Sequence, residues 1–166
     1  MAHRWYVVHA YSGFENKVAQ SIREQAGKKG LDDEITEFPV CSNDYVGRPY
    51  RYSYNVLYKK GDWLFSGLKR FDLRTGRTMR YEYGEGRYGS EPQVARAVGA
   101  KAEDDGYVIS MVADMKADTS EILVLRADDI AAGPVARILL PHRISSGTHS
   151  CWADAREITS DWPGLA

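Results

Sequence analysis

The period of the hydrophobic positions changes along the chain, from a helical to a strand-like pattern. Residues 4–9, RWYVVH, are rich in β-branched and aromatic side chains, which is typical of a buried strand. Ser12 and Glu15 then have the spacing of a capping box, which predicts the start of a helix. An apolar residue recurs every four positions after it, which predicts one stripe packing on a sheet: Phe14, Val18, Ile22 and Ala26. We therefore expect a strand–helix unit over residues 4–30.

The helical period disappears after about residue 36, and a strand-like pattern follows. In residues 50–58, Tyr50, Tyr52, Tyr54, Val56 and Tyr58 alternate with other residues, which predicts a strand with one aromatic face. Further strands are expected at 63–72, 77–83, 106–114, 119–127 and 135–140, separated by turn residues such as those at 74–76, 104–106 and 116–118. Closely spaced strands with no helix between them predict antiparallel sheets, so the fold class is mainly β, and α+β overall.

Composition and charge narrow the function classes. The chain has 166 residues, of which 43% are hydrophobic and 27% charged, and its net charge is -1. These values indicate a soluble globular protein with no field that would draw it to nucleic acid or to an acidic membrane. The tyrosine stripe is therefore expected to pack in a core rather than to stack on bases. No apolar run reaches the length of a membrane span, no signal peptide is evident, and we expect a cytoplasmic protein with Cys41 and Cys151 as free thiols.

The first part of the chain resembles the start of the bacterial transcription elongation factor NusG. Residues 4–33, RWYVVHAYSGFENKVAQSIREQAGKKGLDD, carry the resemblance through an aromatic strand, the AYSG turn and the helix in that order. In that family the N-terminal domain binds RNA polymerase. The resemblance stops at about residue 33, so we expect a NusG-like head over residues 1–35.

The second part resembles the C-terminal region of the carotenoid cleavage oxygenases, which include the lignostilbene dioxygenases. Seven matching pieces occur in family order: EFPV (37–40), YVGRPYRYSY (45–54), GLKRFDLRTGR (67–77), GRYGSEP (86–92), AEDDGYVISMVAD (102–114), SEILVLRADDIAAGPVARILLPHRI (120–144) and GTHSCW (147–152). The resemblance implies a seven-bladed β-propeller with a non-haem Fe(II) held by four histidines. It also implies cleavage of a carbon–carbon double bond by O2. Residues 36–153 would form the last, incomplete blades, and residues 154–166 a polar tail.

The candidate site residues are His149, Glu91 and Glu37. From the sequence pattern alone, His149 could be a metal ligand, a catalytic base or an ordinary polar residue. By the resemblance, His149 matches the last iron-binding histidine, and Glu91 and Glu37 match carboxylates that hydrogen-bond to such histidines and orient them. We expect Glu91 to face His149, and Glu37 to serve a histidine that this chain does not contain.

Three functions follow from these two resemblances. The first is a fragment of an iron dioxygenase acting on an apolar polyene or stilbene, inactive alone because only one of four iron-binding histidines is present. The alternatives are a NusG-like module contacting RNA polymerase through residues 1–33, and a non-functional fusion product. An incomplete propeller leaves open sheet edges, so we also expect self-association.

Overall fold

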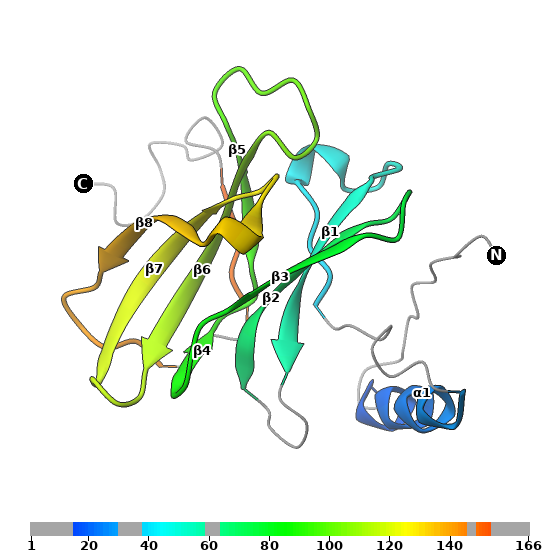
Figure 1. The fold of residues 1–166 in the computed structure, drawn as a ribbon, viewed down its shortest axis with the longest axis horizontal. Coiled ribbons are helices and arrows are strands. Elements are labelled where there is room, and N and C mark those ends of the chain that lie inside the picture. Colours follow the sequence, from blue (N-terminus) through cyan, green and yellow to red (C-terminus); the bar gives the residue numbers. More distant parts are fainter. Residues whose placement is uncertain (1–14, 30–37, 59–63, 146–148, 154–166) are drawn as a thin grey trace, which may run out of the picture.

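The structure, a computed structural model, describes residues 15–29, 38–58, 64–145 and 149–153, and its regular structure is mainly antiparallel sheet (Figure 1). The elements are helix α1 (Glu15–Lys29) and strands β1 (Tyr52–Tyr58), β2 (Phe65–Asp72), β3 (Thr78–Glu82), β4 (Arg87–Gly89), β5 (Gln93–Arg96), β6 (Gly106–Asp114), β7 (Thr119–Arg126) and β8 (Pro134–Leu139). Two short 3-10 helices, η2 (Asn43–Tyr45) and η3 (Ile130–Ala132), lie in connections.

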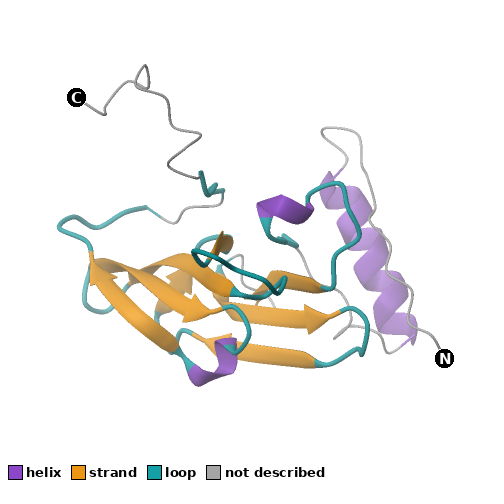
Figure 2. Cartoon of the chain, turned by 90° about the horizontal axis from the view of Figure 1, so that it is seen from above, coloured by secondary structure: helices purple, strands orange, loops and turns teal. Residues whose placement is uncertain are grey.

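The strands form two antiparallel meanders that are joined at one point. Strands β1, β2 and β3 make the first meander, in which we include the segment 38–51 that leads into β1, because Val40 of this segment bridges to Tyr54 on the free side of β1. Strands β5, β6, β7 and β8 make the second meander, and β4 also pairs with β6. The pair Phe65–Gly89 connects β2 to β4 and so links the two meanders. Figure 2 shows the resulting layer of strands with the loops gathered around it.

Each of the six strands predicted between residues 50 and 140 is present within two residues of its expected bounds, and the predicted hairpin turns are confirmed. Gly76 closes the β2–β3 turn with a φ of 74°, a left-handed conformation that glycine adopts without strain. In the β6–β7 turn the Asp114 carboxylate accepts hydrogen bonds from the backbone N–H groups of Lys116 and Ala117, both at 2.9 Å. Strands β4 and β5 were not predicted, because each is short and residues 90–92 interrupt their pattern.

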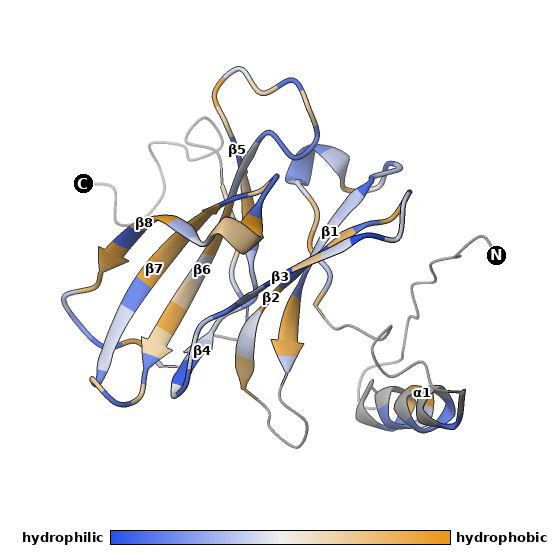
Figure 3. Cartoon of the chain, in the orientation of Figure 1, coloured by the Kyte–Doolittle hydropathy of each residue, from blue (hydrophilic) through white to orange (hydrophobic). Residues whose placement is uncertain are grey.

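The core lies between the two meanders. It combines residues of β1, β2 and the β3–β4 loop with residues of the second meander: Tyr54, Leu68, Tyr83, Val94, Val108, Val112, Leu123, Leu125, Ala127 and Ile130. Figure 3 shows the hydrophobic residues concentrated on these strands and the hydrophilic ones in turns and on α1. Tyr54 is only 2% exposed. The expectation that this tyrosine packs in a core, rather than stacking on bases, is therefore confirmed.

Helix α1 does not use its apolar stripe as the sequence predicts. Val18 is half-buried, but Ile22 is 37% exposed, so the prediction that the stripe packs on a sheet is wrong at Ile22. Figure 1 shows α1 beyond β1, and not on a face of the second meander. The capping residue Ser12 and the strand predicted at 4–9 lie outside the described residues. Within the described part of the chain, no helix is long and apolar enough to cross a membrane.

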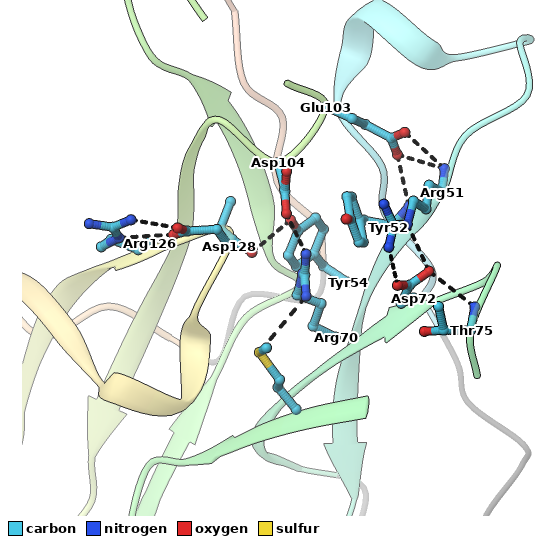
Figure 4. Close-up of polar contacts among 12 residues, drawn as sticks. Arg51, Tyr52, Tyr54, Arg70, Asp72, Thr75, Glu103, Asp104, Arg126 and Asp128 are labelled. Carbon is cyan, nitrogen blue, oxygen red and sulfur yellow. Dashed lines mark hydrogen bonds and ion pairs between the residues drawn. The ribbon is translucent and has the colours of Figure 1, made fainter. Parts of the chain in front are cut away.

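Charged residues of the β5–β6 loop fasten the first meander to the second (Figure 4). The Glu103 carboxylate accepts hydrogen bonds from the backbone N–H groups of Arg51, at 2.7 and 2.9 Å, and Tyr52, at 2.8 Å. The buried Arg70 guanidinium donates to Asp104 at 2.5 Å and stacks 3.9 Å from the centroid of the Tyr52 ring. Since a buried charge without a partner is costly, the Arg70–Asp104 pair defines where this loop meets β2.

A second ion pair, also drawn in Figure 4, closes the first meander near its turn. Arg51 donates two hydrogen bonds to the Asp72 carboxylate, at 2.9 and 2.6 Å. The same carboxylate accepts from the backbone N–H groups of Arg74 and Thr75, at 3.0 and 3.3 Å, and so starts the β2–β3 turn. The Arg51 guanidinium, together with the Thr75 and Arg74 donors, holds the pKa of Asp72 well below its ordinary value.

Candidate metal-ligand site at His149

A bulge between β4 and β5 carries Glu91. Gly89 pairs with Val112 and Gln93 with Ile109, so three residues, 90–92, oppose two, Ser110 and Met111. Pro92 has no backbone N–H to give to the ladder, which suits it to such an interruption. A bulge shifts the alternation of side chains between the two faces of a sheet. The face on which Glu91 lies is therefore not fixed by the alternation of the strand residues on either side of the bulge.

His149 meets this bulge through two contacts. Its Nδ1 lies 3.2 Å from Oε2 of Glu91, and Ser150 donates a hydrogen bond from Oγ to the Glu91 carbonyl oxygen at 3.1 Å. The Glu91 side chain is 17% exposed, whereas that of His149 is 76% exposed. The expectation that Glu91 faces His149 is confirmed. The role of either residue in holding a metal stays a prediction.

The contact determines which ring nitrogen of His149 is available. An ionised carboxylate can only accept hydrogen bonds. The contact with Glu91 therefore favours the tautomer of His149 that carries its proton on Nδ1. Within the described residues, the hydrogen bond of His149 to a side chain uses Nδ1 and leaves Nε2 for a ligand. A neutral imidazole with its second nitrogen held by a carboxylate is the usual form of a histidine that binds Fe(II) or Zn(II).

The first meander provides an aromatic wall beside His149. The Phe38 ring lies 5.7 Å from the His149 ring, between centroids, and 5.3 Å from Phe65, which in turn meets Tyr58 edge-on at 5.2 Å. Phe38 adopts a left-handed φ of 51°, which a non-glycine residue rarely does and which packing must hold. His149 therefore has a carboxylate from one meander and an apolar ring from the other.

The segment after His149 is anchored to both meanders. Ser150 contacts the bulge as described, and Asn43 donates from Nδ2 to the Trp152 carbonyl oxygen at 3.0 Å. Glu37, the third predicted site residue, precedes Phe38 in sequence but lies outside the described residues, so its predicted role is untested. Cys41 and Cys151 are both free thiols, as expected.

The described residues offer one imidazole here, not a complete metal site. Across residues 15–29, 38–58, 64–145 and 149–153, no group of three or more His, Cys, Asp or Glu side chains could hold a metal ion. The donor set nevertheless fits one corner of a histidine-rich site, because a single neutral imidazole is held by a carboxylate. His142, a second histidine of the same segment, is exposed and belongs to the connection after β8.

Residues 8–154 match the protein family described as RPE65, retinal pigment epithelial membrane protein. The chain belongs to this RPE65 family. The match begins inside the segment 1–35 and covers most of the predicted NusG-like head, so that head stays a prediction. The family assignment confirms the resemblance to the carotenoid cleavage oxygenases.

Two curated relatives show how much of a whole protein of this family the chain matches. The chain is 28% identical over 167 residues to lignostilbene-alpha,beta-dioxygenase isozyme III of Sphingomonas paucimobilis, which covers 94% of this chain and 32% of that protein. It is 33% identical over 146 residues to carotenoid 9,10(9',10')-cleavage dioxygenase 1 of Arabidopsis thaliana, covering 80% of this chain and 27% of that protein. The chain therefore spans about a third or less of the length of these RPE65-family relatives.

Among the solved structures, the lignostilbene dioxygenase of Pseudomonas brassicacearum superimposes with a TM-score of 0.65 at 29% identity, over 71% of this chain and 27% of that one. A cobalt-substituted apocarotenoid oxygenase of Synechocystis gives a TM-score of 0.61 at 29% identity, over 68% of this chain and 24% of that one. The fold prediction is confirmed: the chain is mainly antiparallel β and matches part of the β-propeller of these RPE65-family proteins.

Proposed function

We propose that the chain forms one corner of the iron centre of a dioxygenase that cleaves a carbon–carbon double bond in a carotenoid or stilbene-type substrate. His149 is the ligand, through Nε2, and Glu91 is the carboxylate that orients it. The contact of 3.2 Å between His149 Nδ1 and Glu91 Oε2 is the observation that carries this proposal. Bound Fe(II) supplies the activation of O2 that such a cleavage requires.

The chain's own residues have separate tasks in this proposal. Glu91 accepts a hydrogen bond from the Nδ1–H group, which keeps Nε2 unprotonated and makes it a stronger electron-pair donor to the metal. Ser150 ties the backbone beside the ligand to the bulge, so the imidazole and its carboxylate keep one relative position. Phe38 places an apolar ring beside the imidazole, which suits an apolar polyene or stilbene.

One imidazole is too little for tight binding of iron. We therefore expect the isolated chain to bind Fe(II) weakly and to cleave no substrate. The remaining ligands would come from protein outside the described residues, which agrees with the chain's short span of its relatives.

Cobalt(II) titration of the purified full chain tests the ligand assignment. Co(II) is paramagnetic and broadens the NMR signals of the imidazole to which it binds. The His149 ring signals are expected to broaden at lower Co(II) concentration than those of His142, and His149→Ala should remove this first binding event. His142→Ala is the matched control and should leave it intact. Equal broadening of all histidines would contradict the proposal.

A chimera tests the reaction. In the Sphingomonas lignostilbene dioxygenase, the segment that this chain matches is replaced by residues 38–153 of the chain. The chimera is expected to contain iron and to cleave lignostilbene in an O2-dependent reaction, and both properties should be lost with His149→Ala. A folded chimera that retains iron but cleaves nothing would favour the non-functional alternative.

A further inference from the structure

A line of hydrogen bonds runs through the core from Tyr83 to the bulge that carries Glu91. The Tyr83 hydroxyl lies 2.8 Å from Oγ of Ser110, and Ser110 Oγ donates to the Ser90 carbonyl oxygen at 3.4 Å. Ser110 has one hydroxyl hydrogen and uses it in the hydrogen bond to the Ser90 carbonyl oxygen. In the contact between Tyr83 and Ser110, the Tyr83 hydroxyl must therefore be the donor. All three residues are buried, at 5%, 1% and 1% exposure for Tyr83, Ser110 and Ser90.

Ser90 has every polar group engaged. Its N–H donates to the Met111 carbonyl at 2.8 Å, and its Oγ accepts from the Met111 N–H at 3.1 Å. That Oγ also donates to the Glu91 carbonyl at 3.0 Å, while the Ser90 carbonyl accepts from Ser110. The Ser90 Oγ thus takes the place of the backbone carbonyl that would accept from the Met111 N–H in an uninterrupted pair of strands. A fully satisfied buried network of this kind holds one backbone geometry.

Tyr83 is fitted closely to the same bulge. A Cβ on Gly89 would overlap the Cε2, Cζ and hydroxyl atoms of the Tyr83 ring, so glycine is required for the ring to cross the strand there. The Tyr81 ring meets Tyr83 edge-on, with centroids 6.0 Å apart. Burial raises the pKa of Tyr83, which keeps its hydroxyl protonated and able to donate.

We infer that Tyr83 and Ser110 are positioning residues that aim Glu91 at His149. The hydroxyl of Ser110 lies on the same face of β6 as Val108 and Val112, where an apolar side chain would be the ordinary choice. A buried hydroxyl is costly unless it is satisfied, and here its partners are Tyr83 and the bulge alone among the described residues. The part of the inference that concerns a metal rests on the proposed function.

The test uses the full chain without metal and reads the tautomer of His149 from the ¹⁵N shifts of its ring. The spectra are recorded at about pH 8.5, well above the range in which an ordinary histidine titrates, so that the two nitrogens report the ratio of the tautomers. Ser110→Ala and Tyr83→Phe are expected to lower the ratio of the Nδ1-protonated to the Nε2-protonated tautomer by about two-fold, a change that moves both shifts. Ser53→Ala and Tyr81→Phe are matched controls, a buried serine of β1 and the ring beside Tyr83, and should leave the shifts unchanged.

Two outcomes separate this inference from the proposed function. If Ser110→Ala and Tyr83→Phe fold and leave the His149 shifts as in the wild type, the positioning role is overturned. If they move the shifts but Co(II) does not select His149, the positioning role stands and the iron assignment falls. Should Tyr83→Phe fail to fold, Ser90→Ala gives the same decision, because it removes the Oγ that binds Met111 and Glu91.

Discussion

Nδ1 of His149 lies 3.2 Å from Oε2 of Glu91, although the two residues are 58 positions apart in the sequence. The strand bulge at residues 90–92 makes this meeting possible, because an uninterrupted strand would follow a strict alternation of faces. The contact is local in space and depends on both meanders: Glu91 belongs to the second, while Phe38 of the first covers the other side of the imidazole.

Replacing Glu91 by glutamine is expected to weaken metal binding at His149. The amide keeps the size of the side chain but removes the negative charge that favours a proton on Nδ1, and losing such a partner typically lowers metal affinity about 10–100-fold. Co(II) titration followed through the His149 ring signals measures the change. Glu85→Gln, at an exposed carboxylate paired with Lys116, should leave the titration unaltered. Equal weakening by both variants would count against a specific role for Glu91.

The sequence predicts the regular part of this fold well, because period-two alternation and turn residues directly determine hairpins such as those at Gly76 and Asp114. It does not predict β4 and β5, since three and four residues are too short for a period and the bulge breaks their pattern. The segment after Pro92 nevertheless forms a strand paired with β6. Pro92 inside a strand pattern was the available signal for a bulge.

The residues of the candidate site were likewise predicted only in part from the sequence. His149 and Glu91 were found through matched motifs, not through spacing, because nothing in the sequence brings positions 91 and 149 together. Ser110 and Tyr83 were not predicted, since a serine and a tyrosine in strands are unremarkable until their hydroxyls are seen to meet. Helix α1 was predicted correctly, but the predicted packing of its stripe is wrong at Ile22, because packing of a stripe depends on a partner that the pattern does not specify.

Tyr54→Phe is expected to lower the free energy of unfolding by about 1–2 kcal/mol. The Tyr54 hydroxyl donates to the Ala127 carbonyl at 2.9 Å across the interface of the two meanders, and its loss leaves a buried acceptor without that donor. Urea unfolding followed by circular dichroism measures the effect. Tyr107→Phe removes the same hydroxyl from a ring that is 41% exposed and should change stability little. No difference between the two variants would mean that the hydrogen bond contributes nothing across this interface.

Asp72→Asn is expected to reduce the dependence of stability on acid pH. Because Arg51 holds the folded-state pKa of Asp72 below its ordinary value, the stabilisation is complete above about pH 4 and is lost as the pH falls through the folded-state pKa. Urea unfolding at a series of pH values should show wild-type stability falling below about pH 4, with a shallower fall in Asp72→Asn. Glu85→Gln, at a surface pair, should follow the wild type. If stability falls equally with pH in the wild type and in both variants, Asp72 does not contribute to the acid dependence.

Gly89→Ala is expected to destabilise the chain by about 1–3 kcal/mol, the usual range for overpacking a core. The added Cβ has no room beside the Tyr83 ring, so the ring or the strand must shift. A double-mutant cycle with Tyr83→Ala measures the clash: the cost of Gly89→Ala should nearly vanish when the ring is absent. Gly47→Ala provides the contrast, because its Cβ would meet nothing within 4 Å and only its φ of 76° opposes the change. Additive costs in the cycle would show that the ring is not the obstacle.

The edge formed by β8 is expected to drive concentration-dependent self-association. Within the described residues β8 pairs with β7 alone, so one row of its backbone groups faces outward, and its apolar side chains are open to solvent: Val135 at 57%, Ile138 at 51% and Leu139 at 70% exposure. An exposed apolar edge strand is a template for pairing with a second copy of the same chain.

Light scattering coupled to size exclusion should show that the average mass rises with protein concentration. Leu139→Lys should reduce this rise, because a charge on an edge strand opposes pairing without touching the core. Val46→Lys, at a residue 68% exposed after η2, adds the same charge away from the edge and should leave association unchanged. A monodisperse monomer at all concentrations, or equal effects of the two lysines, would show that the β8 edge is not the surface that associates.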